Sequence, residues 1–224
     1  MHALQRFDNV LLAMICIVLI TTVGIYFYSE EFFWGTYAAE DGLVEYATAL
    51  FLLVASVVLV KNAISLRSKG LGLAAACTIF YALLFFFAAG EEISWGQRIF
   101  GWETGERFKE INKQEETNLH NLKFTLFGVE IHLAKTLFGP ILTTILLLYL
   151  VFLPLLYPRV GWIKRLADRF AVPVPRRRHA VLAVAASLVI AAIDVSRKWE
   201  VYELVFSLLA TSIFLIPQNR EHTA

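Results

Sequence analysis

Residues 71–92 read LGLAAACTIFYALLFFFAAGEE, an apolar run that ends in two adjacent glutamates. The twenty residues before Glu91 carry no charge. In an α-helix they extend about 30 Å, which is the thickness of the hydrocarbon core of a bilayer. The run therefore predicts a transmembrane helix with two carboxylates at one end. Because a carboxylate inside the hydrocarbon layer costs about 2.5–3.5 kcal/mol, the pair calls for a physical reason.

Similar apolar runs recur along the whole chain of 224 residues, of which 58% are hydrophobic. Soluble domains contain about 45–50% apolar residues. We therefore predict a single integral membrane domain over residues 1–224, folded as an all-α polytopic bundle of about six transmembrane helices. The expected spans are residues 10–28, 43–60, 71–89, 137–157, 180–196 and 201–217.

The basic residues predict the orientation of these spans. If the chain alternates across the bilayer, residues 1–9, 61–70, 158–179 and 218–224 lie on one side. These segments hold 12 of the 20 Lys and Arg residues but only three of the 19 acids. Loops rich in Lys and Arg stay in the cytoplasm, so both termini are expected there. Because the basic residues form such loops, nothing supports a nucleic-acid-binding function.

The outer region, residues 90–136, is expected to be helical or irregular and to lie outside the bilayer. Its aromatic residues interrupt polar stretches, as is typical of the headgroup layer. A short helix is predicted from Thr104 to Gln114, with Thr104 as its N-cap. Residues 122–135 are apolar but hold charged side chains, so we interpret them as interfacial or re-entrant rather than as a seventh span.

The basic inner loop, residues 158–179, contains a predicted amphipathic helix. Trp162, Ile163, Leu166 and Phe170 share one helical face, and basic side chains lie off that face. This pattern is typical of a helix that lies in the plane of the membrane interface.

The candidate site comes from acids at the outer ends of the spans. In the predicted topology 16 of the 19 Asp and Glu residues fall on the outer side, and several lie at or within a span. Hard divalent cations take carboxylate oxygens, and zinc or iron adds imidazole. We expect a divalent metal, of unknown identity, to neutralise the cluster. The candidate metal ligands are Glu45, Glu91, Glu92, His120, Glu200 and Glu203.

A metal-dependent hydrolase or transferase is the function that this ligand set favours. A bound metal with an open coordination position activates water near neutral pH. The expected substrate is a lipid or a lipid-linked group at the extracytoplasmic face. The candidate catalytic residues are Glu45, Glu92 and His120, and the candidate substrate-binding residues are Gln97, Asn118 and Asn121.

Other functions stay open at this level. The same acids could form a structural polar network, or the site of a small cation- or proton-coupled transporter. Against transport, residues 54–60, 71–76 and 213–216 contain no ionisable side chain that would continue a polar route. A non-catalytic scaffold, whose outer region binds a membrane partner, is a further alternative.

Two strings carry a resemblance, EEISWGQ at residues 91–97 and ETNLHN at residues 116–121. They resemble a family of uncharacterised bacterial multi-pass membrane proteins, over about a fifth of the chain. The resemblance implies a location in the bacterial inner membrane, and it implies no established activity.

Overall fold

The computed structural model describes residues 2–112, 116–119, 121–126, 129–133 and 141–224. In this part of the chain nearly all regular structure is helical. The long helices are α1 (His2–Tyr28), α3 (Leu43–Ser68), α4 (Gly72–Glu92), α10 (Arg177–Ala192) and α11 (Lys198–Leu215). The shorter helical elements are α2 (Glu30–Phe32), η1 (Phe33–Tyr37), η2 (Ser94–Gly96), α5 (Gln97–Phe100), α6 (Glu106–Ile111), α7 (Leu142–Leu147), η4 (Leu148–Phe152), α8 (Leu153–Leu156), α9 (Gly161–Arg169) and α12 (Arg220–Thr223).

Three helices, α1, α3 and α4, are long and apolar enough to cross a membrane. They coincide with the first three predicted spans. The run Leu142–Leu156 passes the same test together with α9, although the two parts are bent by 119°. Helix α10 has 16 residues and extends about 24 Å, which is less than a bilayer core. Helix α11 has charged side chains in its first two turns, so neither of these two helices qualifies by length and composition alone.

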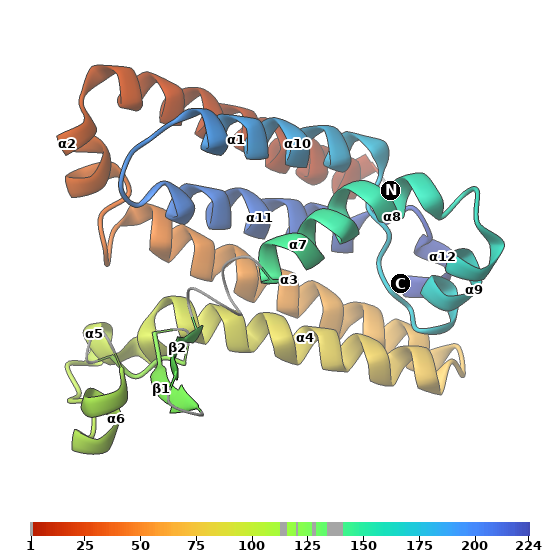
Figure 1. The fold of residues 1–224 in the computed structure, drawn as a ribbon. Coiled ribbons are helices and arrows are strands. Elements are labelled where there is room, and N and C mark those ends of the chain that lie inside the picture. Colours follow the sequence, from red (N-terminus) through yellow and green to blue (C-terminus); the bar gives the residue numbers. More distant parts are fainter. Residues whose placement is uncertain (1, 113–115, 120, 127–128, 134–140) are drawn as a thin grey trace.

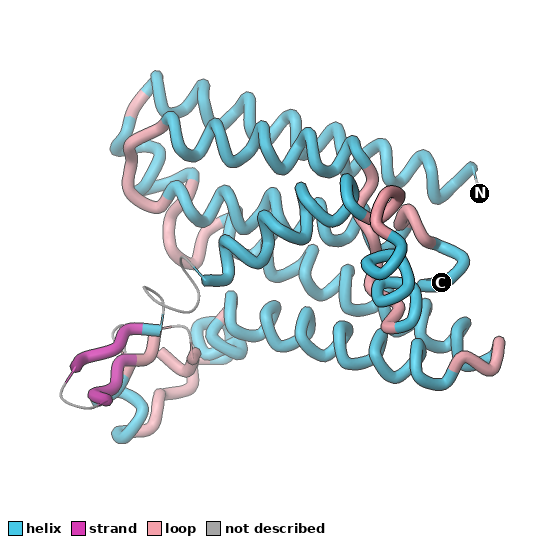
Figure 2. Tube along the Cα trace, turned by 45° about the vertical axis from the view of Figure 1, so that its right-hand side comes forward, coloured by secondary structure: helices cyan, strands magenta, loops and turns pink. Residues whose placement is uncertain are grey.

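The long helices lie side by side, and α11 runs through the middle of them (Figures 1 and 2). It packs against α1, α3 and α10, and α3 packs along α4. Eleven of the 18 residues of α11 are buried, among them Leu208 and Ile213 in the main core. Helix α11 is therefore enclosed largely by protein, which explains how it can hold polar residues that a lipid-facing helix would exclude.

The outer surface of the bundle is apolar. Large hydrophobic side chains such as Ile20 on α1, Leu83 on α4 and Leu188 on α10 are exposed. Contiguous apolar surface of this kind is rare on soluble monomers and marks contact with a membrane or with a partner. The packing and the surface therefore agree with an integral membrane protein.

The two ends of the bundle differ. Both chain termini, α9 and α12 lie at one end, which we call the terminal end (Figure 1). Helices α2, α5 and α6 lie at the opposite end, which we call the loop end, together with a β-hairpin (Figures 1 and 2).

The hairpin is a departure from the all-α prediction. Strands β1 (Lys123–Leu126) and β2 (Val129–His132) pair antiparallel, with Lys123 opposite His132 and Phe124 opposite Ile131. Polar and apolar residues alternate over Lys123–Leu126 and Val129–His132, with a glycine between the two runs. That alternation is a hairpin signal, so the interpretation of residues 122–135 as only an interfacial or re-entrant segment missed their strands.

The predicted helix at residues 104–114 exists in shorter form as α6, and its N-cap is Gly105 rather than Thr104. The hydroxyl of Thr104 instead bonds to the hydroxyl of Thr117 at 3.1 Å. The prediction of Thr104 as a cap was therefore wrong, because a tertiary partner uses its side chain. The last two residues of the predicted helix lie outside the described residues.

The predicted amphipathic helix is confirmed as α9, and Trp162 and Leu166 are exposed on it. Asp168 ties α9 to the rest of the terminal end. It accepts hydrogen bonds from Tyr157 at 2.8 Å, from Lys164 at 2.6 Å and from Asn219 at 3.2 Å. The helix is therefore held in a fixed position beside α12.

Candidate functional site

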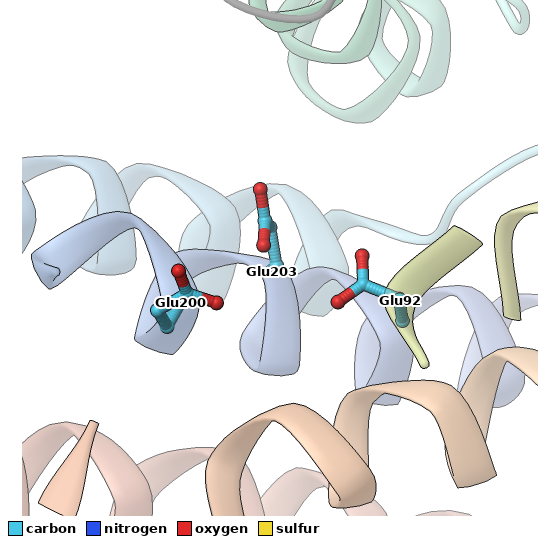
Figure 3. Close-up of side chains that lie close together, drawn as sticks. All are labelled: Glu92, Glu200 and Glu203. Carbon is cyan, nitrogen blue, oxygen red and sulfur yellow. The ribbon is translucent and has the colours of Figure 1, made fainter. Parts of the chain in front are cut away.

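Three carboxylates gather at the loop end, where α4 ends and α11 begins. Glu92 is the last residue of α4, and Glu200 and Glu203 share one face of the first turns of α11. One carboxylate oxygen from each residue lies within 4.8 Å of the other two (Figure 3). Oxygen ligands of one divalent cation lie 2.0–2.6 Å from the ion, so modest side-chain rotation would bring all three oxygens to a single centre. The structure thus brings together three of the predicted metal ligands.

The burial of this cluster, the acid triad, is uneven. Glu92 and Glu200 are half-buried between the helices. Glu203 is exposed. The triad is therefore partly shielded from solvent but open on one side, as a site with a free coordination position requires.

Glu45 adds a fourth negative charge near the triad, from the first turn of α3. Its Oε2 atom accepts a hydrogen bond of 2.6 Å from the backbone N–H of Asp41. This bond holds the carboxylate across the start of its own helix. Its charge repels Glu200 and Glu92. Glu45 therefore has a capping role as well as a position beside the candidate centre.

Two arginines at the loop end, Arg98 and Arg197, are paired with other acids. Arg98 pairs with Glu116 at 2.7 Å and with Asp41 at 3.2 Å. Arg197 pairs with Glu40 at 2.6 Å and acts on Glu200 only at longer range. The hydrogen bond to Glu116 is the main reason why the pKa of Arg98 is raised, so this guanidinium stays charged.

The triad and Glu45 consequently have no salt bridge within the part of the chain that the structure describes. Lys198 is close in sequence, but its Nζ atom donates to the carbonyl of Ile193 at 2.6 Å. Like charges at short range in a partly dry environment cannot all stay ionised without a cation or a proton. The triad therefore needs either a bound cation or protonation of some of its carboxyl groups.

Glu91 lies next to Glu92 in sequence but serves the outer region. It is buried, and its carboxylate accepts hydrogen bonds from the indole of Trp95 at 2.7 Å and from the backbone N–H of Leu119 at 2.5 Å. Ser94 and Trp95 adopt left-handed backbone angles, which turn the chain sharply after α4. Gly90 permits this turn, because a Cβ atom there would approach the Trp95 ring to 2.9 Å. Glu91 thus fastens the outer region to the end of α4.

The two strings quoted from the sequence interlock through buried hydrogen bonds. The Ser94 hydroxyl donates to Glu116 at 3.0 Å, and Asn118 Nδ2 donates to Glu116 at 2.7 Å. The amide of Asn112 in turn donates to Asn118 Oδ1 at 3.0 Å. Sequence reasoning missed the roles of Ser94, Asn112 and Glu116, because their partners lie up to 24 residues away.

The three predicted substrate-binding residues belong to this network. Gln97 Oε1 accepts from the backbone N–H of Thr117 at 2.8 Å. Asn118 is buried, and the backbone N–H of Asn121 donates to its Oδ1 atom at 3.4 Å. The contacts of Gln97 and Asn118 position the outer segment, and substrate binding stays a prediction for all three.

His120, the predicted imidazole ligand and catalytic residue, lies outside the described residues. Its role stays a prediction from the sequence. The described carboxylates already form a cluster without it.

Comparison of the chain with known protein families, with curated proteins and with solved structures finds no match. The resemblance carried by residues 91–97 and 116–121 therefore stays a prediction, and function is argued from the geometry.

Proposed function

We propose that this chain is a metal-dependent hydrolase or transferase embedded in the bacterial inner membrane, acting on a lipid or lipid-linked group at the extracytoplasmic face. The observation that carries the proposal is the acid triad. Three carboxylate oxygens lie within 4.8 Å of one another, on two packed helices, without a salt bridge among the described residues. A divalent cation would neutralise them and gain three hard oxygen ligands.

The proposed topology has six spans with both termini cytoplasmic. Helices α1, α3 and α4 supply three of them. The run Leu142–Leu156 is the proposed core of a fourth, over the predicted span 137–157. Helices α10 and α11 supply the other two. Residues 193–196 extend the fifth segment, which begins with α10, toward the headgroups. Other helices enclose much of α11, so its polar residues need not face lipid. The excess of Lys and Arg in the segments at the terminal end supports a cytoplasmic location for that end.

The proposed chemistry is activation of water by the bound metal. Three carboxylates leave coordination positions for water and for a substrate oxygen. Glu45, whose charge acts on Glu92 and Glu200, is the proposed acceptor of a proton from that water. If His120 joins the ligand set, zinc or iron becomes the favoured metal, and without it a harder ion such as Mg²⁺ or Mn²⁺ does.

The proposed substrate class follows from the surroundings of the triad. The outer region exposes the apolar side chains of Ile99, Phe100 and Trp102. Aromatic side chains in such a position lie at the level of the lipid headgroups. A metal centre at the same end of the bundle would meet ester or phosphate-ester groups at the membrane surface.

Metal analysis of detergent-purified protein tests this proposal. Wild-type protein, incubated with Mn²⁺ or Zn²⁺ and then desalted, is expected to retain about one ion per chain, as measured by plasma mass spectrometry. Glu92→Gln and Glu203→Gln should each lose that ion, whereas Glu31→Gln, an exposed acid at the same end, should keep it. Equal metal content in all four proteins, or none in any, would refute the proposal.

One observation favours transport as a second candidate. Ser207, Thr211 and Ser212 on α11 are fully buried, and they extend a polar line from the triad toward the terminal end. The hydroxyl of Thr211 donates to the carbonyls of Phe51 at 3.0 Å and Ser207 at 2.9 Å. A proton or cation route along this line predicts liposome flux that both Glu45→Gln and Thr211→Val abolish. A metal enzyme predicts that Thr211→Val retains metal and turnover.

A further inference from the structure

A cavity of about 350 Å³, widely open to the surface, lies at the terminal end, remote from the acid triad. It is lined by His2, Gln5, Arg176, Ile216 and Arg220. These residues come from the start of α1, the segment before α10, the end of α11 and the start of α12. Three parts of the chain that are far apart in sequence therefore combine to place two arginines around one space.

The positive charge around this cavity is not balanced. No carboxylate lies within salt-bridge distance of Arg176 or Arg220 in the described part of the chain. Asp8 is the acid that attracts Arg176, but its oxygens already accept hydrogen bonds from Arg178 and Ser212. Burial, and then repulsion from Arg178, lowers the pKa of Arg176, and Arg220 adds to that repulsion.

Two further features add positive charge near Arg176. Arg178 lies close enough to repel Arg176, although its Nε atom is buried and does not line the cavity. Helix α10 begins at Arg177, so the positive end of its dipole lies beside Arg176. Neither feature alone defines a site, but both add to the field of a cavity that is already lined by arginines.

We propose that this cavity binds a phosphate group, which Arg176 and Arg220 hold through charge-assisted hydrogen bonds. Two sources share that chemistry, the headgroup of an anionic phospholipid and a free phosphate ion. The neighbouring helix α9 contacts α12, and it exposes Trp162 and Leu166 as an interfacial helix does. The cavity is therefore level with lipid headgroups, and a lipid phosphate is the expected occupant.

Binding measurements on the full chain in detergent test this site. The thermal midpoint is followed while phosphatidylglycerol, phosphatidylethanolamine or inorganic phosphate is added, and native mass spectrometry counts the lipids that stay bound. Wild-type protein should be stabilised by phosphatidylglycerol in preference to phosphatidylethanolamine. Arg176→Gln with Arg220→Gln should weaken the apparent affinity by about tenfold or more. Arg220→Gln alone, on the short terminal helix, should weaken it in part without risk to the fold.

Arg67→Gln is the matched control, because Arg67 is an exposed arginine near the start of α4 and does not line the cavity. It should bind phosphatidylglycerol as the wild type does. Stabilisation by inorganic phosphate alone, lost in the double variant, would support the site and assign it to a soluble phosphate. Absence of any stabilisation, or the same stabilisation in the double variant as in the wild type, would overturn the proposal.

Discussion

Both ends of the bundle hold acidic residues inside helices, but the acids at the two ends differ in their hydrogen-bond and salt-bridge partners. At the terminal end Asp8 is completely buried, and it accepts hydrogen bonds from Arg178 and Ser212. At the loop end the acid triad has no such partners among the described residues, although Arg98 and Arg197 are close by and bind other acids. The pairing of Asp8 shows that this fold can supply a buried carboxylate with a charged partner. Among the described residues the triad lacks the compensation that Asp8 receives, and we propose that a ligand from outside the chain supplies it.

The residues around Asp8 also show how a structural network of polar side chains can resemble a catalytic network. His179 accepts from the backbone N–H of Arg176 through Nδ1 at 3.0 Å, so its Nε2 atom carries the proton. Nε2 then donates to the Ser212 hydroxyl at 3.0 Å, and Ser212 donates to Asp8. In this order the histidine cannot take the serine proton. The network is a structural clamp between α1, α10 and α11.

The largest expected effect comes from breaking that clamp. Asp8→Asn leaves Arg178 without its carboxylate, and the free energy of unfolding should fall by about 3 kcal/mol. Denaturation in mixed detergent micelles measures the change. Glu221→Gln, an exposed acid at the same end, should leave stability unchanged. A loss no larger for Asp8→Asn than for this control would contradict the assignment of a buried ion pair.

The second effect concerns the outer region. Glu116→Gln removes the charge that pairs with Arg98 and places an amide where Ser94 and Asn118 need an acceptor. The local opening free energy should fall by about 2 kcal/mol. Hydrogen exchange at the amides of Thr117 and Leu119 should become faster. Glu106→Gln, which alters an almost fully exposed acid, should leave the exchange rates unchanged. Exchange in Glu116→Gln that is no faster than in the wild type would refute the role of Glu116 in joining residues 91–97 to residues 116–121.

The third effect changes sign with conditions. In chelator, Glu92→Gln removes one of several repelling charges and should raise stability by roughly 1 kcal/mol. With saturating divalent metal the same variant should be less stable than the wild type, because it has lost a ligand. Thermal midpoints with and without metal give both values. The same sign in both conditions would show that the triad is not a metal site.

The smallest effect is expected at Asp168. Desolvation would raise the pKa of this carboxyl, but hydrogen bonds from Lys164, Tyr157 and Asn219 outweigh it and lower the pKa. The ionised Asp168 carboxylate stabilises the fold at pH values above the usual aspartate pKa, and this stabilisation is lost as the pH falls through the lowered pKa. Lys164→Gln should move the pKa up toward its usual value, as measured by carboxyl NMR. Arg165→Gln should leave it in place, and an unchanged pKa in Lys164→Gln would contradict the pairing.

Much of the helical framework could be predicted from the sequence, because uncharged runs of bilayer length leave few alternatives to a helix. The gathering of acids at one end of the helices could also be predicted, because Glu91, Glu92 and Glu203 lie at the ends of such runs. The divergence of Glu91 and Glu92 could not be assigned, because it depends on where Trp95 and Leu119 come to lie.

Pairings between distant segments were also beyond the sequence. Arg98 donates a hydrogen bond to Glu116 although many other acids are predicted in the same region, and Arg178 donates one to Asp8, which is 170 residues away. Such choices depend on tertiary packing and leave no local pattern. The hairpin formed by Lys123–Leu126 and Val129–His132 is different, because its alternation of polar and apolar residues is visible in the sequence. The apolar character of the whole segment favoured an interfacial or re-entrant interpretation over this signal.

The most direct test of the central claim is a titration of the chelated, detergent-purified protein with Mn²⁺, followed by electron paramagnetic resonance. The account predicts that the wild type and Glu31→Gln each bind about one ion, with loss of the free-ion signal. Glu92→Gln and Glu203→Gln should leave that ion free in solution. A free-ion signal that rises equally in all four proteins from the first addition would contradict the claim that the acid triad is a metal centre.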